Sequence, residues 1–434
     1  MTPFDIGLMA LGGMGVMVLV GMYVPIALML MSFLGVWAIK GSPVLAAKML
    51  GLAANDAIGS YFFGVVPLFV LMGFIVSESG IGRDAFDVAN SMFRKIKGGL
   101  GVGTVAANAI FAAVTGISIA SAAVFTKIAV PEMRRHGYTA RFSVGVVAGS
   151  SVLGMLIPPS LLLILFGLLA EQSIGDLFVA GIGPGLLLSV LFAVGIVVMA
   201  TFTPGFVGET LSTDETVLSS RELLSKGLPI TILIVAVLGG IYAGFFTPVE
   251  AGAIGAMGAL VIGLVKRRLS LSALWRVLTD TGLVTASICF LIIAAQMYSR
   301  MLAFSGLPAA FGDLAATADL GQLGIILLYV GIVILLGMIL DSSSIMLILV
   351  PLMLPILIPM GVDLVWFGIV TVIAIEIGLL TPPFGISVYV IKSTLDDDSV
   401  SLKDIFLGAA PFALMMLICL ACVIAFPWIA TGLL

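Results

Sequence analysis

Two proline-containing motifs hold the residues best suited to chemistry in this chain. They read Gly154-Met155-Leu156-Ile157-Pro158-Pro159 and Gly378-Leu379-Leu380-Thr381-Pro382-Pro383, so the second repeats the first at an offset of 224 residues. A proline lacks the backbone N–H and clashes with the helical turn before it. Each proline pair is therefore predicted to break a helix and to release two backbone carbonyls, at positions 154 and 155 and at positions 378 and 379.

Released carbonyls in an apolar environment need a partner, and a small cation can be that partner. Two serine-rich segments offer further oxygens, and at the same offset Ser118 corresponds to Ser342. The first predicted cation site comprises Gly116, Ser118, Ser121, Ser150, Ser151, Gly154 and Met155. The second comprises Gly337, Asp341, Ser342, Gly378, Leu379 and Thr381. The alternative is that the prolines only kink helices and the small residues only allow close packing.

Sodium is the favoured cation, because a proton route through a membrane usually needs titratable side chains. The first site has none. The second has Asp341 and lies near Glu376, so proton coupling stays open as an alternative. No other cofactor is expected. The residues expected to contact a substrate are Ser118, Pro158, Arg300, Asp341, Ser343 and Pro382.

Several polar side chains have a second interpretation. Asp341 could instead cap the returning helix of a hairpin, and Glu376 could pair with a neighbouring protein. Arg300 is the one basic residue that can reach a substrate carboxylate from within a span, but it can also extend to the membrane interface. His136 is expected to be solvated in a basic loop, and Glu250 is expected to stabilise a helix start.

The composition excludes a soluble protein. Hydrophobic residues make up 61% and charged residues 10% of the 434 residues, against about 25% charged residues in a typical soluble domain. We therefore expect an all-α polytopic membrane protein. A net charge of −4 gives no reason to expect a nucleic-acid partner. Cys419 and Cys422 lie in an apolar run, where we expect them to pack rather than to do redox chemistry. No removable signal peptide is expected.

Apolar runs of about 20 residues predict membrane-spanning helices. The predicted crossings are residues 4–22, 24–39, 58–77, 140–170, 177–203, 228–246, 248–265, 281–303, 364–391 and 404–432. Two further apolar stretches, 98–130 and 322–354, have polar residues in their middle. Basic residues flank the first and acidic residues flank the second, so we predict two re-entrant hairpins that enter from opposite faces. With the basic loops in the cytoplasm, 16 of the 19 Lys and Arg residues lie inside.

The repeated motifs divide the chain into two halves. Residues 1–203 and 228–434 would each hold five crossings and one hairpin, joined by a cytoplasmic linker at 204–227. Because five is an odd number, the second half should enter the membrane from the opposite side. Scaffold helices are expected at 1–80 and 228–303, and broken helices at 140–170 and 364–391. Inverted repeats with broken helices are typical of secondary transporters, which bind substrate near the bilayer midplane.

Four ordered segments carry a resemblance to a known family. They are Gly244-Phe245-Phe246-Thr247-Pro248-Val249-Glu250-Ala251, Leu153-Gly154-Met155-Leu156-Ile157-Pro158-Pro159-Ser160, Gly337-Met338-Ile339-Leu340-Asp341 and Leu380-Thr381-Pro382-Pro383-Phe384-Gly385. With the small-residue tip around Ser118, they make the chain resemble the large membrane (M) subunit of the TRAP transporters, the tripartite ATP-independent periplasmic family, of DctM type. The family more often has Thr where Val249 stands.

The resemblance implies partners and a mechanism. Family members pair this subunit with a small four-helix membrane (Q) subunit, which we expect here as a separate chain. A periplasmic binding (P) protein delivers the solute. The cargo is a small organic acid such as a C4-dicarboxylate, a 2-oxo acid or sialic acid, and a sodium gradient drives import across the bacterial inner membrane. An elevator-type transporter surrounded by membrane lipid is implied, and no enzymatic activity.

Three other functions remain as alternatives. The first is a stand-alone carboxylate symporter, coupled to sodium or to protons, that needs no binding protein. The second is an intramembrane enzyme, which fits poorly because the spans contain no H-E-x-x-H motif and no Ser/His pair. The third is a scaffold subunit that transports nothing, for which two symmetric helix breaks would be an unnecessary cost.

Overall fold

The computed structural model describes residues 1–208, 218–317 and 321–434, and the regular elements in these ranges are helices. Within them, six helical segments are long and apolar enough to cross a membrane, or seven if one bent pair counts as a single span. The predicted crossings 4–22, 24–39 and 364–391 fall on shorter apolar helices of 10–17 residues, and so do the first helix of the first predicted hairpin and both helices of the second. The chain is therefore an all-α polytopic membrane protein.

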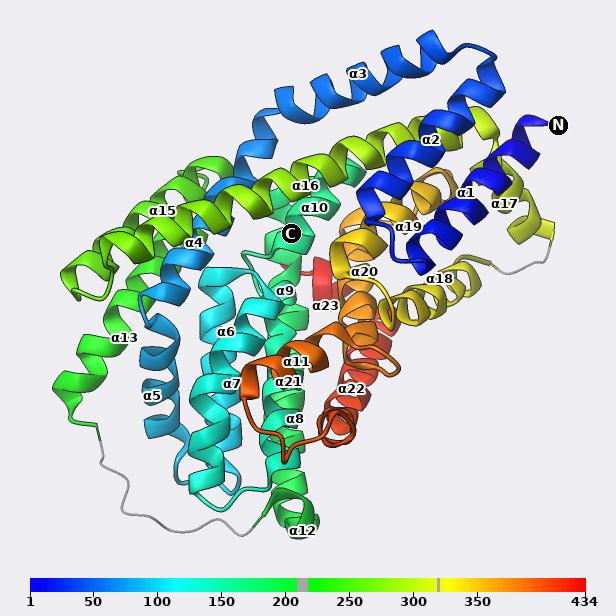
Figure 1. Ribbon diagram of the computed structural model, residues 1–434. Coiled ribbons are helices and arrows are strands. Elements are labelled where there is room, and N and C mark those ends of the chain that lie inside the picture. The colour runs from blue at the N-terminus through cyan, green and yellow to red at the C-terminus, as the bar shows by residue number, and fades with distance from the viewer. Residues whose placement is uncertain (209–217, 318–320) are drawn as a thin grey trace.

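One side of the molecule consists of helices from both halves (Figure 1). These are α1 (Pro3–Leu19), α2 (Val24–Lys40), α3 (Pro43–Gly59), α4 (Val65–Glu78), α13 (Ser220–Ile234), α15 (Pro248–Val265) and α16 (Leu271–Ser305). The 35-residue helix α16 packs against α2, α3 and α4, and α15 packs against α4. We call this set the scaffold. Its outward-facing side chains are largely apolar, as a bilayer requires.

Three predicted boundaries differ from the helix ends in the structure. The helix within the predicted crossing 58–77 begins at Val65, and residues 58 and 59 belong to the separate helix α3, which Ser42 caps. Helix α16 begins ten residues before the predicted 281, because Ser270 caps it. The predicted linker 204–227 includes part of a helix, since a capping box between Ser219 and Glu222 starts α13. Residues 209–217 of that linker lie outside the described residues.

The stretches 98–130 and 322–354 each contain two helices joined by a short turn. The first pair is α6 (Gly99–Thr115) and α7 (Ser118–Arg135), and the second is α18 (Gly321–Gly337) and α19 (Ser342–Leu357). Gly116, with φ +64°, ends α6 in the left-handed conformation that glycine adopts readily. Asp341 starts α19 as its N-cap. That these hairpins re-enter the membrane stays a prediction.

Both proline pairs interrupt helices at matching places. In the first half, α8 (Ala140–Ser151) and α9 (Leu153–Leu156) end before Pro158, and α10 (Leu161–Ala170) follows. In the second half, α20 (Leu364–Leu380) ends before Pro382, and α21 (Ile386–Leu395) follows. The ends at Leu156 and Leu380 keep the 224-residue offset. The helix bounds thus repeat, whereas the opposite membrane orientation of the halves remains a prediction.

A glycine in the left-handed conformation precedes a matching helix in each half. Gly80 (φ +66°) precedes α5 (Ile81–Phe93), and Gly306 (φ +69°) precedes α17 (Leu307–Thr317). Helix α4 meets α5 at a bend of 66°. Since α5 leads from the scaffold to the first hairpin, and α17 leads toward the second, these two short helices are the connections between the scaffold and the hairpins.

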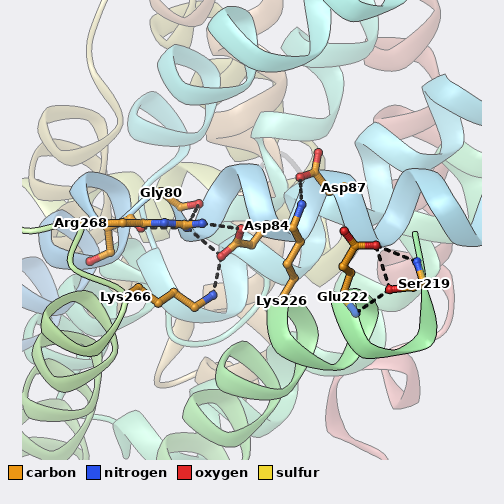
Figure 2. A network of polar contacts seen from close by, with 9 residues as sticks. Gly80, Asp84, Asp87, Ser219, Glu222, Lys226, Lys266 and Arg268 are labelled. Carbon is orange, nitrogen blue, oxygen red and sulfur yellow. Dashed lines mark hydrogen bonds and ion pairs between the residues drawn. The ribbon is translucent and has the colours of Figure 1, made fainter. Parts of the chain in front are cut away.

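An ion-pair cluster fixes α5 to the scaffold (Figure 2). The Asp84 carboxylate, whose side chain is 2% exposed, accepts hydrogen bonds from Lys266 Nζ at 2.5 Å and Arg268 Nη1 at 2.8 Å. Asp87 accepts one from Lys226 Nζ at 2.5 Å. A buried carboxylate requires such partners. The cluster joins the first half to α13 and to the α15–α16 connection of the second half.

A second set of ion pairs joins the halves at the far side from the scaffold. There α11 (Ile174–Phe202) packs against α22 (Leu402–Ala425), and Arg141 Nη2 donates to Asp404 at 2.7 Å. Arg134 pairs with Asp397. Hydrogen bonds from the side chain and backbone of Ser399, together with Arg134, lower the pKa of Asp397 to about 2. This carboxylate therefore stays ionised at physiological pH.

Candidate functional site

The first hairpin tip lies directly on the first helix break. Leu161 N–H, just after the proline pair, donates to the Gly116 carbonyl at 3.1 Å. A Cβ added at Gly116 would lie 2.4 Å from the Pro159 carbonyl oxygen, and one added at Gly154 would lie 3.0 Å from the backbone of Ile117. The approach is backbone to backbone, so residues of the first predicted cation site do come together.

The second half repeats this contact. Phe384 N–H, just after the second proline pair, donates to the Met338 carbonyl at 3.2 Å. A Cβ added at Gly378 would lie 2.6 Å from the Gly337 Cα. Gly154 and Gly378, 224 residues apart, thus each face the backbone of a hairpin tip. The halves differ in exposure, because Pro158 and Pro159 are buried whereas Pro382 and Pro383 are exposed.

Two of the carbonyls near the breaks have hydrogen-bond partners. The Ser160 hydroxyl donates to the Met155 carbonyl, and Thr381 N–H donates to the Gly378 carbonyl at 3.0 Å. The prediction that the carbonyls at positions 154, 155, 378 and 379 are all free was therefore wrong for Met155 and Gly378. In both halves a polar residue beside the prolines replaces the missing N–H donor. A carbonyl oxygen has two lone pairs, so these groups keep one for another partner.

Asn108 is a buried residue of the first site that sequence reasoning missed. Its amide Nδ2 donates to the Ser150 hydroxyl at 2.6 Å, and Ser150 in turn donates to the Val146 carbonyl at 2.7 Å. Because the Ser150 hydrogen is used in this way, the Asn108 amide nitrogen must face Ser150, and Asn108 Oδ1 is buried without a partner. A single Asn in the apolar stretch 98–130 was the available signal.

Of two further serines in the first predicted site, Ser151 has a hydrogen-bond partner and Ser121 has none. Ser151 donates to the Ala148 carbonyl at 2.8 Å, whereas Ser121 is fully buried and its hydroxyl has no hydrogen-bond partner. In the second half, Asp341 accepts from Ser344 N–H at 3.1 Å and from the Ser344 hydroxyl. Asp341 is thus a helix cap, and a further role for it as a cation ligand stays a prediction, as does one for the half-buried Ser343.

Glu376 lies where the two hairpins meet. Its Oε1 lies 3.5 Å from the hydroxyl of Ser118 on the first tip and 3.5 Å from the hydroxyl of Ser342 on the second. The residue is 1% exposed, and its Oε2 is buried without a hydrogen bond. Sequence reasoning placed these two serines in separate sites. The structure brings both to one carboxylate.

Arg300 lies away from this convergence. Its guanidinium donates to Asp56 at 2.6 Å and to the Met49 carbonyl at 2.9 Å, so it attaches α3 to α16. Contact with a substrate would require this pair to open. Glu250 forms a capping box with Thr247, which confirms its expected structural role. His136 is half-buried, and its Nδ1 lies 2.8 Å from the Glu132 carbonyl oxygen.

An apolar cavity of about 790 Å³ lies between α1, α17 and the second hairpin. Among its lining residues are Met14, Phe311, Leu336 and Leu349, and none of the lining side chains is charged. A carboxylate there would have no ionic partner and would be costly to desolvate. The polar convergence around Glu376, and not this cavity, is therefore the candidate site.

The family model described as "Tripartite ATP-independent periplasmic transporter, DctM component" matches residues 11–429. This chain belongs to that DctM family. The family consists of transporter permeases, so the chain is a multi-pass membrane transport protein and not an enzyme.

Relatives within the DctM family carry different cargo names. The C4-dicarboxylate TRAP transporter large permease of Pseudomonas aeruginosa is 33% identical over 89% of this chain and 90% of its own length. The sialic acid large permease of Vibrio cholerae is 30% identical over 88% and 87%. The ectoine large permease of Halomonas elongata is 31% identical over 84% of both chains. Membership alone therefore does not define the cargo of a DctM-family protein.

Solved structures show the same fold at low sequence identity. The YdaH transporter of Alcanivorax borkumensis has a TM-score of 0.63 and 16% identity, and the match covers 89% of both chains. MtrF of Neisseria gonorrhoeae has a TM-score of 0.56 and 12% identity, covering 87% of this chain and 83% of its own. At such low sequence identity, the similarity to these two structures shows the fold alone.

Proposed function

We propose that this DctM-family permease imports a small organic acid, driven by a sodium gradient. The observation that carries the proposal is the duplicated contact of a hairpin tip with a proline break, with both tips converging on one buried carboxylate. Broken helices facing hairpins place polar backbone groups inside a protein that is otherwise apolar. In secondary transporters such elements form the sites for substrate and coupling ions.

The oxygen-rich surroundings of the breaks support sodium as the coupling ion. One ion would bind near Ser118, Asn108 and Gly154, and a second near Asp341, Gly378 and Thr381. Asn108 Oδ1 and Ser121 Oγ are buried acceptors without partners in the first half, so the residues present fit a hard cation. Bound sodium would contribute positive charge inside the membrane. Each charge that moves inward adds about 2.3 kcal/mol per 100 mV to uptake.

An anionic substrate would lie between the two hairpin tips. Helices α7 and α19 begin at Ser118 and Ser342, and helix N-termini carry partial positive charge that favours a carboxylate. The relatives named for C4-dicarboxylates and sialic acid support an organic acid. We further propose that Ser343, Pro158 and Pro382 line the same space. Arg300 has less support, because it is paired with Asp56.

An elevator mechanism would move the hairpins and breaks against the scaffold. The moving part would comprise α6–α11 and α18–α22, which pack closely on one another, while α5 and α17 connect it to the scaffold. Tripartite family membership supports two partners, a small membrane subunit and a periplasmic binding protein. Such a system works in the inner membrane of a bacterium, in contact with membrane lipid.

Uptake into proteoliposomes tests the proposal. The chain would be reconstituted with its small partner, and radiolabelled organic acids would be offered together with the binding protein under an imposed or absent inward sodium gradient. We expect sodium-dependent uptake of one acid that stops when the binding protein is omitted. Uptake without the binding protein would instead establish a stand-alone symporter. Uptake driven by a proton gradient and unaffected by sodium would refute the proposed coupling.

A further inference from the structure

We propose that Glu376 forms a third sodium site, shared by the two hairpins and additional to the two sites near the helix breaks, the first of which it would adjoin at Ser118. This inference rests on the proposed sodium coupling and extends it. Glu376 lies on α20, while Ser118 and Ser342 begin α7 and α19, so the site is assembled from both halves. No single half of the repeat contains it.

A buried carboxylate is costly inside the membrane. Glu376 is 1% exposed, and a charged group in such a position is stable only with a partner. Within residues 1–208, 218–317 and 321–434, no Lys, Arg or His forms an ion pair with Glu376. The two serine hydroxyls lie 3.5 Å from Oε1, at the outer limit of a hydrogen bond. They contribute little charge stabilisation at that distance.

Two oxygen atoms, one on α20 and one on α7, are buried without a hydrogen-bond partner. Glu376 Oε2 is buried and has no hydrogen bond, and the same is true of Ser121 Oγ. Ser121 follows Ser118 by three residues on α7, so both side chains lie on the same face of that helix. Ser121 is therefore about one helical turn from Ser118, the residue that contacts Glu376. Buried polar groups are normally satisfied, so the unsatisfied Glu376 Oε2 indicates a missing ligand.

Sodium fits these groups better than a water molecule. A water can donate a hydrogen bond to Glu376 Oε2, but it leaves the negative charge of the ionised carboxylate uncompensated. A sodium ion accepts carboxylate and hydroxyl oxygens as ligands and also neutralises the carboxylate. Because Ser118 and Ser342 belong to different hairpins, an ion here would hold both tips together. Sodium would then close the two tips jointly rather than one at a time.

Equilibrium binding of radioactive sodium tests this site directly. The full chain would be purified in detergent, with potassium as the replacing cation, and compared with Glu376→Gln, which preserves the side-chain shape. We expect Glu376→Gln to bind one sodium ion fewer than wild type while the two sites near the breaks still fill. Thr371→Val is the matched control, because Thr371 is also a buried polar residue on α20 but bonds to Phe367 and Tyr329. It should bind the wild-type number.

The outcomes separate this inference from the proposed function. If wild type binds no sodium, the coupling ion itself is wrong. If wild type binds sodium and Glu376→Gln binds the same number with the same affinity, only the shared site is refuted. Intact sodium binding in the variant together with a loss of proton uptake would assign the carboxylate to a proton. Should Glu376→Gln fail to fold, as judged by its unfolding midpoint in potassium, Glu376→Asp, which keeps the charge but shortens the side chain, should weaken the binding of one ion several-fold.

Discussion

Replacing Gly378 with alanine should reduce uptake at least tenfold while most of the chain stays folded. The added Cβ would lie 2.6 Å from the Gly337 Cα and 2.9 Å from the Ile334 carbonyl oxygen. Both are backbone atoms, so the contact can be relieved only if the second hairpin moves away from the break. Overpacking of this kind costs about 1–3 kcal/mol. The larger effect is on function, because the hairpin tip would no longer lie on the residues it contacts.

Gly331→Ala is the matched control for this prediction. Gly331 lies on the same hairpin helix, α18, and nothing lies within 4 Å of a Cβ added there. Initial uptake rates of the two variants would be compared at equal amounts of reconstituted protein, and Gly331→Ala should transport at the wild-type rate. Wild-type uptake by Gly378→Ala would show that close contact between hairpin and break is not needed for transport.

Asp84→Asn should lower the free energy of unfolding by about 3 kcal/mol. Breaking a buried ion pair by removing one partner typically costs 3–5 kcal/mol. We expect the lower end of this range, because Lys266 is 16% and Arg268 39% exposed and both can turn toward solvent. The amide keeps the size of the side chain, so the change reports charge and hydrogen bonding. The loss should be visible as a lower midpoint of thermal unfolding in detergent.

Glu78→Gln provides the comparison for the Asp84 variant. Glu78 lies 3.6 Å from Arg276, and their side chains are 41% and 63% exposed. An exposed pair of this kind contributes about 0–1 kcal/mol. If both variants lowered the unfolding midpoint equally, the buried cluster would have no special role in fixing α5 to the scaffold.

Local signals made part of the fold predictable. The proline pairs at 158–159 and 382–383 indicate helix breaks because proline cannot continue a helix. Gly116 and Asp341 indicate the hairpin turns because one favours a helix end and the other a helix start. Helix α3 has a start signal in Ser42-Pro43, but Lys48 and Asp56 interrupt any apolar run there. A search for spans therefore could not find it.

Long-range pairings account for what the sequence could not show. Glu376 and Ser118 are 258 residues apart, and Asp84 and Lys266 are 182 residues apart. No periodicity or motif relates them, since each contact depends on how the two halves pack. The internal repeat predicted two equivalent sites, one in each half. A carboxylate shared between the halves departs from that symmetry, because the position 224 residues before Glu376 is Val152.

The position of the substrate is the most direct test of the central claim. Electron cryo-microscopy of the chain with its small partner, in sodium and with the transported acid present, would locate the density. We predict substrate density between the hairpin tips, within hydrogen-bonding distance of Ser118 or Ser342. Density beside Arg300 and Asp56, or in the apolar cavity next to α1, with none between the tips, would contradict the proposed site.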